Sequence, residues 1–89
     1  MPSIMLRVAP TKESESRFAF VVSTKVSKKA VVRNKLRRRL REIVRLELPH
    51  IQQGHDVLIA VRPQAIRMSY QELRTALIEL FTKARLFHA

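Results

Sequence analysis

The segment Lys28–Arg45 constrains the fold more than any other part of the chain. It holds half of the 18 lysines and arginines, and Glu42 is its only acid. At about 100° per residue, its apolar side chains fall on one stripe of an α-helix, at the spacing of a face that packs against a core. That stripe consists of Val32, Leu36, Leu40 and Ile43. We therefore predict a helix here, with this stripe buried.

A second face of the same helix is cationic. Its members lie three, four or seven residues apart and include no carboxylate: Asn34, Arg37, Arg38, Arg41 and Arg45. Surface helices often mix signs, because opposite charges four residues apart attract, whereas like charges at this spacing destabilise the helix. A polyanion would relieve that repulsion, and the planar fork of arginine matches phosphate oxygens. We interpret this face as a nucleic-acid-binding surface; the alternative is a solvated basic face without a partner.

The composition supports a single small basic domain, residues 1–89. A net charge of +11 and a pI near 11.6 favour nucleic acid as the partner, followed by an acidic membrane surface. The absence of cysteine excludes disulfides, thiol nucleophiles and thiolate metal sites. No stretch resembles a signal peptide or a membrane-spanning helix. We expect a soluble, cytoplasmic protein.

Two strands are predicted before the basic helix. Ile4–Val8 and Arg17–Thr24 both alternate with the period of a half-buried strand. Ile4, Leu6 and Val8 share one face of the first, and Phe18, Phe20 and Val22 share one face of the second. The polar segment Thr11–Ser16 between them is expected to form an exposed hairpin loop, with the two strands antiparallel. Ser27 is a plausible N-cap for the helix, and Lys25, Lys28 and Lys29 would then lie beside the anion-attracting helix N-terminus.

Two further elements are predicted after the basic helix, which should end near Leu48. Val57–Val61 has a nearly continuous apolar run, so we expect a strand buried on both faces. Ser69 and Glu72 have the spacing of a capping box that begins a second amphipathic helix. The predicted fold class is α+β: a small two-layer sandwich in which a sheet of three or four strands packs against two helices, with a strand-helix-strand crossover.

No pattern for self-sufficient catalysis is present. The seven acids show no local grouping, the three histidines lack ligand spacing, and one glycine, Gly54, is too few for a phosphate-binding loop. We therefore predict no catalytic residue, no metal site and no small-molecule cofactor bound by the protein alone. Neutralising about five phosphates predicts a slope of log K against log salt near −3.5 to −4.5. We favour RNA over duplex DNA as the polyanion.

At Ala30–Glu42 the sequence AVVRNKLRRRLRE resembles the signature of the bacterial ribonuclease P protein component. The family pattern is Arg-Asn-Arg followed by an apolar residue and a basic pair. Arg33 and Asn34 match it, and Lys35 replaces the second arginine. The similarity continues through VVSTKVSKK, DVLIAVRP and SYQELRTALIELFTKARL, so it covers about three quarters of the chain.

The resemblance implies a protein that binds a catalytic RNA and helps it to remove the 5′ leader of precursor transfer RNA. Catalysis and magnesium would belong to the RNA, and the leader would lie in a cleft beside the sheet. It also implies a left-handed crossover, against the general right-handed rule. With Arg45 added from the cationic face, the expected RNA-binding residues are Lys25, Lys28, Lys29, Arg33, Asn34, Lys35, Arg37, Arg38, Arg41 and Arg45. We expect loss of Arg37 and Arg41 to weaken RNA binding with little change in thermal stability.

The chain departs from the family pattern in two places. Members usually carry a further helix before the first strand, whereas this chain starts almost at that strand. We therefore expect either a leader cleft that lacks one wall or a true start that lies upstream. Thr24 stands where the family has the first lysine of a pair. The alternative functions are a structural RNA-binding protein of the ribosomal or assembly-factor type, and a membrane-surface protein.

Overall fold

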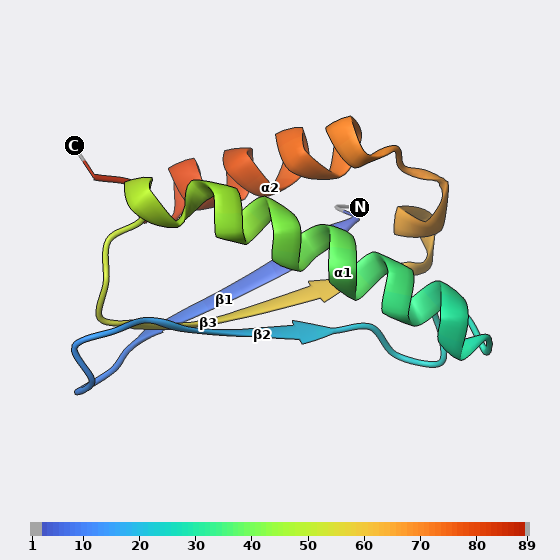
Figure 1. Cartoon of the computed structure of the whole chain (residues 1–89), viewed down its shortest axis with the longest axis horizontal. Coiled ribbons are helices and arrows are strands. Elements are labelled where there is room, and N and C mark those ends of the chain that lie inside the picture. The colour runs from blue at the N-terminus through green and yellow to red at the C-terminus, as the bar shows by residue number, and fades with distance from the viewer. Residues whose placement is uncertain (1–2, 89) are drawn as a thin grey trace.

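A three-stranded sheet carries two helices on one of its faces (Figure 1). The computed structural model describes residues 3–88. In chain order the main elements are β1 (Ile4–Pro10), β2 (Arg17–Val21), α1 (Ala30–Glu47), β3 (His55–Val61) and α2 (Tyr70–Lys83). Short 3₁₀ turns follow α1 at Leu48–His50 and β3 at Pro63–Arg67. The predicted two-layer α+β sandwich is confirmed.

The central strand is β3, and the sheet order is β1-β3-β2. β3 is antiparallel to β1, with Val8 opposite Val57, and parallel to β2, with Phe18 also opposite Val57. The predicted hairpin of the first two strands is therefore wrong, because β3 lies between them. Alternation identified each strand, but it carries no information about which strand is the neighbour.

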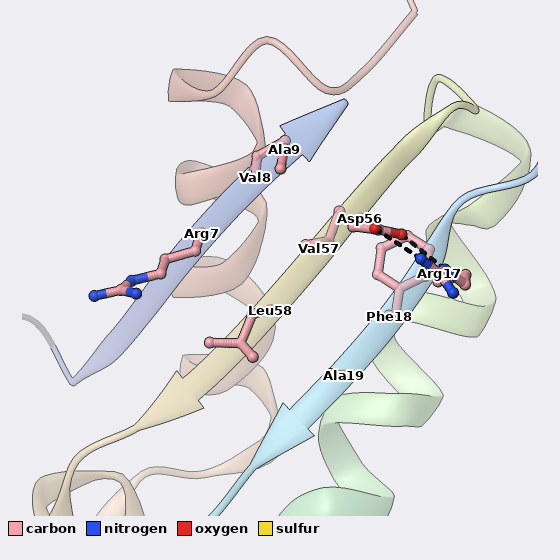
Figure 2. Close-up of a pocket in the computed structure, with 9 residues that line it drawn as sticks. All are labelled: Arg7, Val8, Ala9, Arg17, Phe18, Ala19, Asp56, Val57 and Leu58. Carbon is pink, nitrogen blue, oxygen red and sulfur yellow. Dashed lines mark hydrogen bonds and ion pairs between the residues drawn. The ribbon is translucent and has the colours of Figure 1, made fainter. Parts of the chain in front are cut away.

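The β2-α1-β3 crossover is left-handed, as the resemblance implied. Figure 2 shows the sheet from the face opposite the helices, with β3 between β1 and β2 and both helices behind the strands. With the helices turned to the front and β2 pointing up, β3 lies to the left of β2. Nearly all parallel crossovers have the opposite hand. General packing rules alone would therefore have predicted this connection wrongly.

The core lies between the helices and one face of the sheet. Leu36, Leu40 and Ile43 of α1 are buried as predicted, whereas Val32 is only partly buried and Val44 joins the core. α2 contributes Leu73, Leu77 and Phe81, each fully buried, and the sheet contributes Ile4, Val57, Ile59 and Val61.

The other face of β3 is open, so the expected burial on both faces is wrong. Leu58 is 37% exposed, because both helices of the described chain lie on the same side of the sheet. The apolar run of β3 therefore reflects its central position and not a second covering layer.

The start of α1 also differs from its prediction, whereas the start of α2 does not. Lys29, not Ser27, occupies the N-cap position of α1 and makes no side-chain cap hydrogen bond. Ser27 Oγ instead accepts from the Lys29 backbone N–H at 3.2 Å. The capping box of α2 is confirmed: Ser69 Oγ accepts from Glu72 N–H at 3.1 Å, and Glu72 Oε1 accepts from Ser69 N–H at 2.9 Å.

α2 ends in a left-handed turn at Arg85, where φ is 56°. The backbone N–H of Leu86 donates to the Phe81 carbonyl at 3.0 Å, and that of Arg85 donates to the Thr82 carbonyl at 3.1 Å. These two bonds define a Schellman motif, whose left-handed position strongly favours glycine. Leu86, the next residue, is 1% exposed and anchors the turn in the core.

We expect Arg85→Gly to stabilise the protein, because glycine adopts this backbone conformation without a steric penalty. The gain should be about 0.5–1 kcal/mol, after allowing for the greater freedom of glycine in the unfolded chain. Urea denaturation measures it. Lys83→Gly removes the same charge from the last turn of α2 and should destabilise. An unchanged or lower midpoint for Arg85→Gly would contradict the strain assigned to Arg85.

Candidate nucleic-acid interface

α1 presents its cations on the side away from the core. Among the residues predicted to bind RNA, Arg33 and Arg37 are partly buried. The exposed ones are Lys25, Lys28, Lys29, Asn34, Lys35, Arg38, Arg41 and Arg45. The side chains of Lys28, Lys35 and Arg38 are among those that make no hydrogen bond or ion pair within residues 3–88. These three charges are fully available to an external anion.

Three arginines form a row along the side of α1 that faces β2. Arg33, Arg37 and Arg41 are four residues apart, and each contacts a different residue of β2 or of the loop that follows it. Arg41 lies over the Phe20 ring, 5.7 Å from the ring centroid. Arg37 Nη2 donates to the Val22 carbonyl at 3.1 Å, and Arg33 Nη1 donates to the Ser27 carbonyl at 2.9 Å.

This row revises the expectation that Arg37 and Arg41 are dispensable for stability. The two backbone carbonyls that accept hydrogen bonds from Arg37 and Arg33 belong to the loop that carries Lys25 and Lys28. Each such bond contributes about 0.5–1.5 kcal/mol to stability. The arginines therefore brace the loop as well as carrying charge. Sequence periodicity placed Arg37 and Arg41 on one face, and the family resemblance added Arg33, but neither gave a sign of these carbonyl partners.

Asn34 accepts a hydrogen bond from Arg37 on the surface of α1. Arg37 Nη1 donates to Asn34 Oδ1 at 2.9 Å, across three residues. The Arg37 guanidinium thus has two neutral acceptors, one side-chain amide and one backbone carbonyl. Its positive charge is oriented but not neutralised.

The cationic face is not free of carboxylates, contrary to its prediction. Arg45 donates to Glu42 through Nη2 at 2.7 Å and Nε at 3.0 Å. These bonds lower the pKa of the Glu42 carboxyl, and they raise the pKa of Arg45. The periodicity analysis placed Glu42 off this face, but a long arginine side chain reaches it from three residues away. Arg45 is therefore the least available of the predicted phosphate contacts.

The N-terminal end of α1 concentrates positive charge. The first turn contains no acidic residue, and Lys28 and Lys29 precede it. The helix dipole places further positive charge at this end, so the lysines are held where cations are electrostatically unfavourable. A phosphate group bound here would reverse that penalty.

The open face of the sheet holds a second candidate surface, a groove of about 730 Å³ (Figure 2). Arg7, Leu58 and Ala19 form one cross-strand row on this face, with the arginine on β1 and the apolar side chains beside it. The whole groove is lined by Arg7, Val8 and Ala9 of β1, Arg17, Phe18 and Ala19 of β2, and Asp56, Val57 and Leu58 of β3.

Arg17 and Asp56 close one end of this groove. Arg17 Nε and Nη2 donate to the two Asp56 carboxylate oxygens, both at 2.9 Å, and these bonds lower the pKa of the carboxyl. Sequence analysis identified no residue of this surface, although the position of Arg7 on the polar side of the first strand was a usable signal. In residues 3–88 no cluster of three or more metal-ligating acids or histidines occurs. No described helix has the length and apolar composition to cross a membrane.

Fold and surface together define a small α+β protein that displays a cationic helix and a groove on the open face of its sheet. Residues 1–85 match the ribonuclease P family, and the chain belongs to that family. Among its relatives, the ribonuclease P protein component of a Cyanothece species is 44% identical over 72 residues. That of Synechocystis is 41% identical over 83 residues.

Solved structures agree with this assignment. The Staphylococcus aureus RNase P protein superposes with a TM-score of 0.86 at 26% identity, covering 96% of this chain and 77% of that one. The Thermotoga maritima RNase P protein superposes with a TM-score of 0.81 at 28% identity, covering 90% and 76%. The chain spans 55% of the Cyanothece relative and 67% of the Synechocystis one, whereas the matches cover 81% and 92% of this chain.

Proposed function

We propose that this chain acts as the protein subunit of ribonuclease P, which removes the 5′ leader from precursor transfer RNA. The RNA subunit performs the cleavage with magnesium ions that it binds itself, and the protein supplies no catalytic group. The observation that carries this proposal is the exposed cationic face of α1 on the fold of a ribonuclease P family member. The complex works in the cytoplasm, where the transcripts are.

The RNA subunit binds the cationic face of α1 and the loop before it. Lys28, Lys35 and Arg38 contact phosphates directly, since they have no competing partner among the described residues. Arg33, Arg37 and Arg41 use the guanidinium N–H groups that their protein acceptors leave free. Lys25 and Lys29 add charge at the helix N-terminus, and Arg45, paired with Glu42, contributes least.

The groove on the open sheet face holds the single-stranded leader. Single strands bind where cations follow the backbone and flat surfaces receive the bases. Arg7 is the cation on the β1 side, and Leu58 and Ala19 form the apolar floor beside it. Arg17 is held by Asp56, so the acid reduces the positive charge at that end.

Reconstitution tests this function. Adding the protein to ribonuclease P RNA at low magnesium should restore leader cleavage of precursor transfer RNA, because the cationic surface replaces part of the charge screening that magnesium otherwise supplies. Cleavage rates with and without protein measure the effect. A structural RNA-binding protein of another kind would bind RNA but leave the cleavage rate at its protein-free value, and that result would refute the proposal.

A further inference from the structure

We infer that Asn34 is a positioning residue that orients Arg37 toward the RNA, and that it does so without neutralising the charge of Arg37. The inference rests on the proposed function and assigns a distinct role within its RNA-binding surface. Asn34 Oδ1 and the Val22 carbonyl are the two acceptors that hold the Arg37 fork, at 2.9 and 3.1 Å. Because the guanidinium is planar, two acceptors fix the direction of its remaining N–H groups.

Protein stability does not account for the bond between Asn34 and Arg37. Asn34 is exposed, so its carbonyl would be hydrated in any other rotamer. An exposed hydrogen bond contributes little net stability once the lost freedom of a long arginine side chain is included. Arg38, the next residue, has no such partner among the described residues. A specific orientation of Arg37 is what the bond provides.

The pair Arg45–Glu42 shows why an amide, and not an acid, serves at position 34. Both arginines donate to a side chain three residues earlier on α1, at 2.9 Å for Arg37 and 2.7 Å for Arg45. Glu42 neutralises Arg45, whereas Asn34 offers a similar acceptor without charge. Arg37 is therefore oriented and remains fully cationic, which is the state that binds phosphate most strongly.

A double-mutant cycle on RNA binding tests this role. Asn34→Ala should weaken binding of ribonuclease P RNA about tenfold in the native background and have little effect when Arg37 is already alanine. Asn34→Ala should also flatten the slope of log K against log salt by about 0.7–0.9, the value of one lost phosphate contact, although asparagine is uncharged. A direct contact from the Asn34 amide would lower affinity but leave that slope unchanged.

Arg38→Ala provides the matched control, because Arg38 has the same charge and lies on the same helix. Asn34→Ala and Arg38→Ala should be additive. Additivity of Asn34→Ala with Arg37→Ala, or an unchanged salt slope, would overturn the inference while leaving the proposed function intact. Failure of the native protein to bind the RNA would overturn both.

A second variant covers the case in which Arg37→Ala disturbs the fold through its bond to Val22. Arg37→Lys keeps the charge, but its compact ammonium lacks the planar fork that spans both acceptors. In the Arg37→Lys background, Asn34→Ala should again lower the affinity for ribonuclease P RNA by much less than tenfold. A full tenfold loss there would show that Asn34 acts independently of the fork and would overturn the inference. Circular dichroism of each variant monitors folding.

Discussion

Leu40→Ala is expected to lower the free energy of unfolding by about 2–5 kcal/mol, through loss of apolar burial and the cavity that remains. Leu40 is fully buried, in the middle of α1, and lies in the cluster that joins both helices to the sheet. For a domain of this size the loss is a large part of the total stability. Urea denaturation followed by circular dichroism measures it.

Leu46→Ala is the matched control. Leu46 lies on the same helix but is 49% exposed, so the same substitution should change the free energy of unfolding by much less, within about 1 kcal/mol. Equal losses for the two variants would mean that burial of the side chain does not determine the cost of the substitution. That outcome would contradict the assignment of the Leu36, Leu40 and Ile43 stripe to the core.

Removing three cations whose side chains have no partner in the described chain should weaken binding to ribonuclease P RNA by about two orders of magnitude near 0.1 M salt. The variant combines Lys28→Gln, Lys35→Gln and Arg38→Gln. The loss of three phosphate contacts should flatten the slope of log K against log salt by about 2–3. Because the three side chains are exposed and have no partner among the described residues, thermal stability should stay the same or rise slightly. Filter binding across a salt series measures affinity and slope.

A control variant that loses the same charge elsewhere distinguishes RNA binding by the face of α1 from a general effect of net charge. Lys12→Gln, Arg67→Gln and Lys83→Gln remove three exposed cations from the β1–β2 loop, the turn after β3 and the end of α2. This control should retain most of the affinity and of the salt slope. Similar losses in both variants would show that net charge alone drives binding, and the cationic face of α1 would no longer be the binding surface.

Local sequence patterns predicted most of the secondary structure correctly. The period of the apolar residues placed α1 and its buried stripe, and the Ser69–Glu72 spacing placed the start of α2, because both signals depend only on nearby residues. Strand pairing and burial of the second face of β3 were predicted wrongly. Those properties depend on segments distant in sequence, such as β1 opposite β3.

The candidate interface was likewise predicted only in part from the sequence. Periodicity identified which cations share the face of α1, since helical spacing determines that. It could not distinguish Arg38, which is free of partners in the described chain, from Arg37, which is held by Asn34 and Val22, or from Arg45, which is paired with Glu42. The groove on the open sheet face was not identified at residue level, because it joins three strands.

The sequence by itself determined that this chain folds around an amphipathic cationic helix, and it predicted a polyanion as the partner, because charge and apolar period are properties of a single segment. Only the tertiary structure decided which arginines remain available and where the second surface lies. Those outcomes depend on the left-handed crossover, which packs α1 beside β2 and brings the Val22 and Ser27 carbonyls within hydrogen-bond distance of Arg37 and Arg33.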